Sequence, residues 1–269
     1  MYKLLNKAKK IIKTINVKII KWLILAICFS STTISAKQIA IVIDDIGYHQ
    51  RDLEFLSLPG QLSYSILPHT PYSQIFATLA SQSNKELLLH VPMQALNGKE
   101  LGPGALTLNM NKEQLQQTLG TALASLPQVK GVNNHMGSAL TQKSQAMKWT
   151  MEVLKKRHLY FLDSRTTELS QAQNAANFLG VANISRQVFL DNITTPEQLQ
   201  LRLEELKQLA TIHNSAIAIA HPYPETIEFL RHALPELTKQ GFELVPVSQL
   251  VERKYIQLAQ AEGKEISAR

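Results

Sequence analysis

The sequence predicts an α/β fold with a parallel sheet, open or closed into a barrel, in a single domain. Short apolar runs alternate with longer amphipathic stretches from residue 37 onward, which is the order of strand–helix–strand units. The chain has no internal repeat, low-complexity tract or clear linker, so one domain accounts for its length. Residues able to bind metal or move protons follow several of the apolar runs, which indicates where a site would form.

Eight apolar runs are the predicted strands, at residues 39–43, 62–67, 86–91, 129–133, 158–162, 188–190, 216–220 and 242–245. Between them lie five predicted helices, at residues 72–83, 112–125, 145–157, 196–213 and 225–240. Asn111 is placed to cap the second helix, and Thr195 with Pro196 to begin the fourth. The irregular stretch 93–110, with Gly and Pro, is expected to be a surface loop over one end of the sheet.

The net charge of +7 is concentrated at the N-terminus. Residues 1–36 hold seven of the 28 basic side chains and no acidic one, which leaves 21 basic against 21 acidic side chains in the remainder. A nucleic-acid-binding domain would itself be basic, so we expect no nucleic-acid partner. The neutral remainder also argues against simple electrostatic capture of an acidic polymer, although it leaves room for a local basic groove.

The N-terminal segment has the pattern of a secretory signal peptide. Lysines precede an apolar run at residues 22–29, and small polar residues lead to Ala36. The run is shorter than the roughly 20 residues of a membrane-spanning helix. We therefore predict a signal peptide at residues 1–36 and a protein secreted through the inner membrane into the periplasm. Two alternatives stay open: an uncleaved anchor, which would be the only membrane contact, and a lipoprotein signal at Cys28, which the bulky Ile27 disfavours.

Five predicted strands end at residue types that do chemistry. These residues are Asp44 with Asp45, His90, His135, Asp163 and His221. The carboxyl ends of parallel strands meet at one edge of a sheet, where active sites form, so these distant residues are candidates for one pocket. Each has an ordinary explanation when taken alone, as a helix cap or a hydrogen-bonded structural residue. Their recurrence at five strand ends favours a shared site.

The adjacent carboxylates of Asp44 and Asp45 need compensation, because like charges at the end of a buried strand repel each other and lose solvation. A divalent metal would supply it. The only cysteine, Cys28, lies in the signal segment, so the ligands would be His, Asp or Glu. Two histidines and a carboxylate form a catalytic zinc site with one position left for water, whose pKa zinc lowers to about 7. The second aspartate would then be free to act as a base.

Other classes of enzyme lack their motifs. The sequence contains no G-x-S-x-G, no Walker-type loop, no G-x-G-x-x-G and no H-E-x-x-H. A glycosidase that pairs Asp44 or Asp45 with Asp163 is conceivable. It would leave three strand-end histidines without a role.

Five segments of the chain carry a family resemblance: IAIVIDDIG, ELLLHVPMQ, GVNNHMGS, FLDSRT and AIAHPYPETIEFLRHALPELTKQGFELVPVS. In that order they resemble the divergent polysaccharide deacetylase family of secreted bacterial proteins, over about residues 38–250. The resemblance implies an irregular (β/α) barrel of the polysaccharide deacetylase type at residues 37–252. From their polar composition, residues 253–269 are expected to form a C-terminal tail. It also implies metal-dependent hydrolysis of acetyl groups on sugars.

The resemblance assigns roles to the strand-end residues. Asp44 is the expected base and Asp45 the first metal ligand. His90 keeps the first histidine of the family's H-x-x-x-H motif, whereas Gln94 stands where the second would be. We expect His135, on a different strand, to supply the third ligand.

The remaining roles follow from the same resemblance. His221 matches the late histidine that protonates the leaving group, and Asn134, backbone N–H groups or the metal would stabilise the oxyanion. His135 lies where an Arg-Pro motif is usual, so the arginine that orients the base is missing. Arg165 is the expected substitute, with Asp163 holding either His221 or Arg165.

The sequence therefore predicts a metal-dependent hydrolase, with zinc as the expected metal, that removes acetyl groups from an N-acetylated glycan such as peptidoglycan or an exported polysaccharide. The alternative is a non-catalytic glycan-binding or envelope-scaffolding protein on a deacetylase-like barrel. Gln94 and the missing Arg-Pro motif favour the alternative. The complete set of strand-end carboxylates and histidines favours the enzyme.

Overall fold

The computed structural model describes residues 1–3 and 36–261 of the chain, and the chain from Ala36 onward forms one compact unit. Its strands are β1 (Lys37–Ile46), β2 (Ser63–Ile66), β3 (Glu86–Met93), β4 (Gly131–Met136), β5 (Tyr160–Asp163), β6 (Asn183–Ser185), β7 (Val188–Phe189), β8 (Ser215–Ala220) and β9 (Phe242–Leu244). All eight predicted strands are confirmed. Strand β6 was not predicted, because its three residues contain a single apolar side chain.

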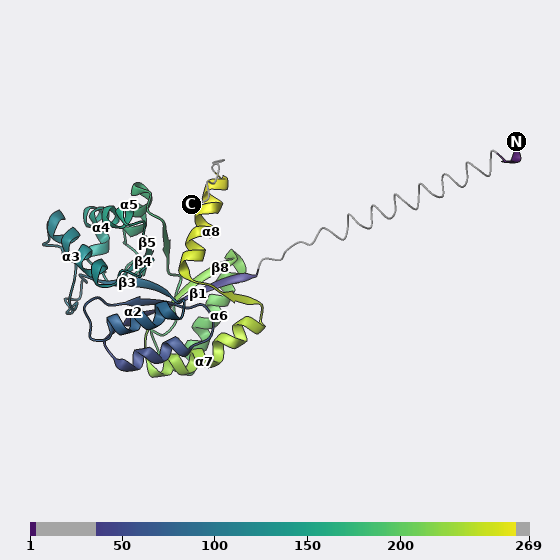
Figure 1. Cartoon of the computed structure of the whole chain (residues 1–269), viewed down its shortest axis with the longest axis horizontal. Helices are drawn as coiled ribbons and strands as arrows, with labels where there is room; N and C mark the ends of the chain where they lie inside the picture. The colour runs from purple at the N-terminus through teal and green to yellow at the C-terminus, as the bar shows by residue number, and fades with distance from the viewer. Residues whose placement is uncertain (4–35, 262–269) are drawn as a thin grey trace. The chain divides into compact units, whose positions relative to one another are not determined.

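The strands form one parallel sheet in the order β6-β5-β4-β3-β2-β1-β8-β7, with β9 paired to β1 beside this path. Figure 1 labels five of these strands, β1, β3, β4, β5 and β8. The sheet is curled into a half-barrel covered by helices. Among the described strands no pairing joins β6 to β7, so an open seam remains between them. The predicted α/β class and the irregular barrel are confirmed.

The helices are α2 (Ser73–Gln82), α3 (Lys112–Ser125), α4 (Ser144–Lys156), α5 (Ala172–Leu179), α6 (Pro196–His213), α7 (Pro224–Lys239) and α8 (Val247–Ala261), with 3-10 helices η1 (Gln50–Ser57) and η2 (Leu140–Gln142). The five predicted helices are confirmed to within one residue at each end. The predicted caps are also present: Asn111 Oδ1 accepts from Gln114 N at 2.9 Å, and Thr195 Oγ1 accepts from Gln198 N at 3.4 Å.

Helix α8 corrects the predicted C-terminal boundary. The polar tail expected at residues 253–269 is wrong for residues 253–261, which continue this helix. Its buried residues Val247, Leu250 and Val251 follow helical spacing. Arg253 and Lys254 also hold the helix in place, through hydrogen bonds to Gln38 Oε1 at 3.1 Å and Asn183 O at 3.0 Å. Residues 262–269 lie outside the described part of the chain.

Strand alternation decides which side chains face the inside of the half-barrel. Successive residues of a strand point to opposite faces, and every second residue enters a small inner core: Ala40 and Val42 of β1, Leu88 of β3, Tyr160 and Leu162 of β5, and Ile217 and Ile219 of β8. Helix α8 closes this core, whereas α2 to α7 pack through a larger core on the outer face. By the same alternation, the residues two positions after Val42, Leu88 and Ile219 belong to the inner face. These residues are Asp44, His90 and His221.

Within residues 1–3 and 36–261, no helix is both long enough and apolar enough to cross a membrane. The signal peptide predicted at residues 1–36 lies almost wholly outside the described residues.

Candidate metal centre

A local irregularity in β1 brings both carboxylates to the same site. The pairing of β1 with β2 shifts register between Ile43 and Ile46, as expected at a β-bulge. Asp45 has a φ of 57°, in the left-handed region that residues other than glycine rarely adopt. In a regular strand Asp44 and Asp45 would point to opposite faces. The bulge instead leaves both within reach of His90.

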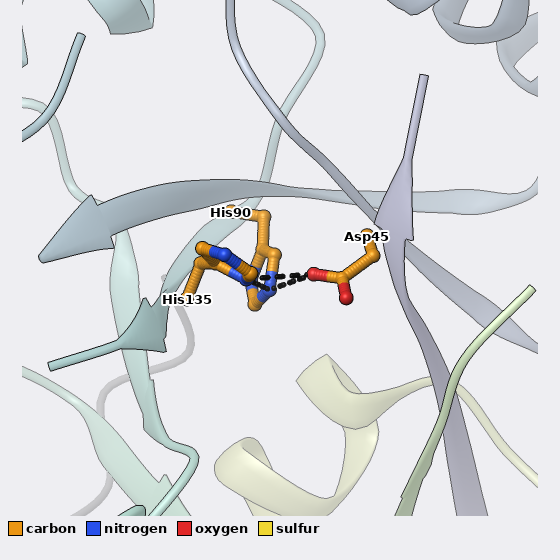
Figure 2. Close-up of side chains that lie close together, drawn as sticks. All are labelled: Asp45, His90 and His135. Carbon is orange, nitrogen blue, oxygen red and sulfur yellow. Dashed lines mark hydrogen bonds and ion pairs between the residues drawn. The ribbon is translucent and has the colours of Figure 1, made fainter. Parts of the chain in front are cut away.

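Asp45, His90 and His135 come from β1, β3 and β4, with β2 between the first two strands in the sheet. Their side chains point toward one another in Figure 2. Asp45 Oδ1 lies 3.0 Å from His90 Nε2 and 2.7 Å from His135 Nδ1. His90 Nε2 and His135 Nδ1 are 3.2 Å apart. Parallel pairing of β3 with β4 sets this distance, because His90 is opposite Asn133 and His135 lies two residues further along the same face.

These three residues fit a divalent cation. Asp45 Oδ1 is buried and has no aligned hydrogen-bond donor among the described residues, although both imidazoles are close to it. An oxygen in this position is costly unless a positive charge or a donor satisfies it. Ligands about 2.0–2.2 Å from a tetrahedral zinc lie roughly 3.3–3.5 Å from one another, and the distances between the three ligand atoms, 2.7 to 3.2 Å, approach this. The set therefore could bind a metal.

Asn133 links the triad to Asp44. Its Nδ2 donates to both carboxylate oxygens of Asp44, at 2.8 and 3.1 Å, and its Oδ1 lies 2.7 Å from His90 Nδ1. Since Oδ1 can only accept, His90 Nδ1 carries a proton, which leaves Nε2 as the nitrogen that would bind a metal. Asn133 was not predicted from the sequence, because an amide neither titrates nor ranks among the usual metal ligands.

The surroundings shift the pKa values of Asp44 and Asp45 in opposite directions. Burial raises the pKa of Asp44 above its ordinary value, although the charges of His90 and His221 oppose the rise. Burial also acts to raise the pKa of Asp45, but its contacts with His135 and His90 outweigh burial and lower it. Such a pair divides its roles readily, with Asp44 suited to accept a proton and Asp45 to remain a charged ligand.

His221 is held by Asp191, which was not predicted from the sequence. Asp191 Oδ1 lies 2.8 Å from His221 Nδ1, while Asp191 Oδ2 accepts from His221 N at 2.6 Å and from Thr226 Oγ1 at 2.8 Å. Burial lowers the pKa of His221, but the hydrogen bond and charge of Asp191, helped by Asp45 and Asp44, raise it to about 9. Asp191 follows the run 188–190, so the strand-end rule would have found it.

Asp163 does not hold His221. Its Oδ1 accepts from the Arg165 backbone N–H at 2.8 Å, and its Oδ2 accepts from Ser170 Oγ at 2.7 Å. Of the two predicted contacts, only the one with Arg165 is present. The Arg165 guanidinium bonds to Glu168, and no hydrogen bond or ion pair of residues 36–261 joins it to Asp44. These contacts contradict the prediction that Arg165 orients the base.

Asn134 and Gln94 also have structural partners. Asn134 is buried, accepting from Ser164 N at 3.0 Å and donating to Met136 O at 2.7 Å, so it joins the ends of β4 and β5. These bonds contradict its predicted role in an oxyanion hole. Gln94 Oε1 accepts from Leu108 N at 2.8 Å and so fixes the base of the loop after β3. The side-chain oxygen of Gln94, its only metal-binding atom, is therefore already engaged by a backbone N–H.

A cavity of about 300 Å³ opens beside the triad and is lined by Asp45, His135, Leu101, Tyr48 and Tyr223 together with neighbouring residues. The two tyrosines are partly exposed, and aromatic rings of this kind offer an apolar face with a polar edge. The cavity is at the lower end of the size range of small-molecule sites.

Comparisons with known proteins agree with this geometry. The family described as divergent polysaccharide deacetylase matches residues 41–251. An uncharacterized protein of Haemophilus influenzae is 35% identical over 223 residues, which cover 82% of this chain and 79% of that protein. The uncharacterized protein YibQ of Escherichia coli is 35% identical over 222 residues, covering 82% of this chain and 69% of YibQ.

Two solved structures show the same fold. An uncharacterized protein from Agrobacterium tumefaciens C58 has a TM-score of 0.78 at 23% identity, covering 81% of this chain and 91% of that one. A CE4 family pseudoenzyme from Bacillus anthracis has a TM-score of 0.51 at 15% identity, covering 81% and 66%. The matched segment contains every residue of the triad as well as Asp44, Asp191 and His221. The chain belongs to the divergent polysaccharide deacetylase family.

Proposed function

We propose that the protein is a metal-dependent hydrolase that removes acetyl groups from an N-acetylated glycan, with peptidoglycan or an exported polysaccharide as the target. The observation that carries the proposal is the convergence of a ligand triad, a buried carboxylate of raised pKa and a histidine of raised pKa at one edge of the sheet. Membership of a family of polysaccharide deacetylases supports the hydrolase class and a glycan as substrate.

Asp45, His90 and His135 would hold the metal, with zinc the expected ion for two imidazoles and one carboxylate. Bound there, zinc would supply Lewis-acid chemistry, polarising an acetyl carbonyl and acidifying water. The buried acceptor atom Asp45 Oδ1 supports this assignment.

Side chains of the protein would carry out the proton transfers. Asp44, oriented by Asn133, would take a proton from the attacking water. His221, kept protonated through neutral pH by Asp191, would give one to the departing amine. With Asn134 committed to its backbone partners, oxyanion stabilisation would come from the metal or from backbone N–H groups.

We also propose that the protein works in the periplasm, after export directed by residues 1–36. The lysine-rich start, the short apolar run and the small residues up to Ala36 support export.

A second candidate is a non-catalytic glycan-binding or scaffolding protein. The engagement of Gln94 with the loop after β3, and of Arg165 with Glu168, favours it. Gln94 stands where the resemblance expects a metal-binding histidine, and Arg165 was the expected substitute for the missing arginine. The Bacillus anthracis protein of similar fold is a pseudoenzyme, which is a further reason to test this candidate. The same tyrosine-lined cavity would then bind the sugar without reaction.

Acetate release separates the two candidates. Zinc-loaded protein is incubated with N-acetylglucosamine oligomers and with peptidoglycan, beside the variant Asp44→Asn. The enzyme is expected to release acetate, and Asp44→Asn to lose roughly 10²–10⁴-fold of that rate while keeping its metal and fold. Sugar binding without acetate release by the parent would support the binding protein instead.

A further inference from the structure

A second cavity, of about 450 Å³, lies at the open seam of the half-barrel. Residues of the β5–α5 turn, the β6–β7 connection and α8 line it, and none of them lines the cavity beside Asp45 and His135. We call it the seam pocket and define it by Arg165, Arg186, Arg253 and Lys254. It is separate from the candidate metal centre.

The seam pocket is strongly cationic. Four of its lining residues are arginine or lysine, and none of the residues lining it within the described chain is Asp or Glu. This is not a consequence of an excess of basic residues, since residues 37–269 hold 21 basic and 21 acidic side chains. All four cations are half-buried, so water screens their mutual repulsion less well than at an open surface.

The cations are fixed mainly by neutral groups. Arg186 donates from Nε to Ser164 O at 2.7 Å and from Nη2 to Arg165 O at 2.8 Å. Carbonyl oxygens also hold the side chains of Arg253 and Lys254, as described for α8. These bonds position the side chains without neutralising their charges. Each guanidinium has five N–H donors, so donors remain for a ligand.

One carboxylate approaches the rim of the pocket. Glu168 bonds to Arg165 Nη2, but the Glu168 side chain is 84% exposed, and exposed ion pairs of this kind contribute little. Burial lowers the pKa of Arg186, and the charge of Arg165 lowers it further, while Asp163 and Glu168 oppose this. Burial also lowers the pKa of Lys254. An anion in the pocket would relieve this repulsion.

We propose that the seam pocket binds a phosphate group. Three guanidiniums and an ammonium around one cavity match a dianion with several terminal oxygens better than a single carboxylate, because arginine forks bind phosphate oxygens in pairs. The cavity has room for more than the phosphate itself, and the amide side chains of Gln173, Gln187 and Gln257 line it. We therefore place a phosphorylated saccharide first among the possible carriers. The inference stands independently of deacetylation.

Direct binding tests the proposal. Isothermal titration is run on the full chain with N-acetylglucosamine 1-phosphate, inorganic phosphate and phosphatidylglycerol vesicles as the phosphate probes, and with glucuronate as the carboxylate probe. The protein is measured zinc-loaded and zinc-free, so that phosphate at the metal centre is recognised by its dependence on zinc. The variants are Arg165→Gln and the double variant Arg253→Gln with Lys254→Gln. The control is Arg202→Gln, whose exposed side chain pairs with Glu205 on α6.

We expect zinc-independent binding of at least one phosphate probe, and weaker binding of glucuronate. Each pocket variant should weaken phosphate binding roughly tenfold or more, and Arg202→Gln should not change it. Whichever phosphate probe binds most tightly identifies the carrier. If the double variant fails to fold, Arg165→Gln decides, because its side chain bonds only to Glu168 among the described residues. Absence of binding by the parent, or equal binding by parent and pocket variants, would overturn the proposal.

Discussion

Asn133 donates its side-chain amide to both carboxylate oxygens of Asp44, at 2.8 and 3.1 Å, from the centre of the half-barrel. Its carbonyl oxygen faces His90 Nδ1 at 2.7 Å. One neutral side chain therefore orients the proposed base and fixes the tautomer of a proposed metal ligand. An arginine in this place would add a positive charge and lower the pKa of Asp44. The amide orients Asp44 without adding that charge.

Replacing Asn133 should damage both functions at once. In Asn133→Ala, His90 loses its Nδ1 partner and Asp44 loses two hydrogen bonds. We expect metal affinity to fall about 10–100-fold, as for other losses of a group that positions a ligand, and acetate release to fall with it even at saturating zinc. Zinc titration and acetate assays measure the two effects. Asn174→Ala, which removes an exposed amide bonded to Gln171, is the control. Unchanged zinc affinity in Asn133→Ala would contradict this role.

The Asp191–His221 contact sets a pH dependence. The pKa of His221 in the folded protein is about 9, above the ordinary value of 6.5 for histidine, so the fold favours the protonated form. The contribution of protonated His221 to the free energy of unfolding is therefore fully present below pH 6.5. It is lost as the pH rises through about 9. Activity that needs protonated His221 should decline over the same alkaline range.

The variant Asp191→Asn should lower the pKa of His221, because it removes the paired negative charge while keeping the shape of the side chain. The imidazole titration, followed by NMR, and the alkaline limb of the rate profile should both move to lower pH. Thr226→Val removes only the hydroxyl that bonds to Asp191, so it should produce a smaller shift. An unchanged His221 titration in Asp191→Asn would rule out this coupling.

Gln94 should matter for the loop rather than for the metal. In Gln94→Ala, the Leu108 N–H loses its acceptor, so residues 95–109 should exchange amide hydrogens faster. The zinc content should stay at the parental value, because Asp45, His90 and His135 form the ligand triad and the Gln94 side-chain oxygen is engaged by the Leu108 N–H. Hydrogen exchange and metal analysis of the same preparation test both statements. Loss of zinc from this variant would show that the side chain reaches the metal.

Gly131 lies against the inner core, and we expect that a larger residue there would destabilise the protein. A Cβ added there would lie 2.4 Å from the ring of Tyr160, which is buried in the inner core. We expect Gly131→Ala to destabilise the protein by about 1–3 kcal/mol or more through overpacking. Gly120→Ala in α3 is the matched control, since its nearest neighbour is Arg157 Nη2 at 4.0 Å. It should stabilise the helix by about 0.5–1 kcal/mol. Thermal unfolding of both variants tests this prediction. Equal melting temperatures of Gly131→Ala and Gly120→Ala would contradict the packing argument.

Much of the site could be predicted from the sequence because parallel strands bring their carboxyl ends together. His90 and His135 each come from a predicted apolar run or its end, and parallel pairing alone places them on one face. Asp45 needed more than this rule. Its orientation depends on the bulge between Ile43 and Ile46, which arises from pairing with β2 and leaves no pattern in the sequence.

The partners of the site residues were harder to predict than the residues themselves. Asp163 was expected to hold either His221 or Arg165, but β7 lies beside β8, and Asp191, which follows β7, is the partner of His221. The identity of that neighbouring strand depends on the order of the sheet, which no local pattern encodes. Arg165 was similarly assigned by residue type, whereas the turn after β5 directs it toward Glu168 and the seam pocket.

The amount of zinc that the protein binds tests directly whether Asp45, His90 and His135 form a metal centre. The protein is loaded with zinc, dialysed and analysed by mass spectrometry beside His135→Ala and the control His232→Ala, an exposed histidine on α7. We expect one equivalent in the parent and in His232→Ala, and loss of that equivalent in His135→Ala. No bound metal in the parent, or full occupancy in His135→Ala, would contradict the claim.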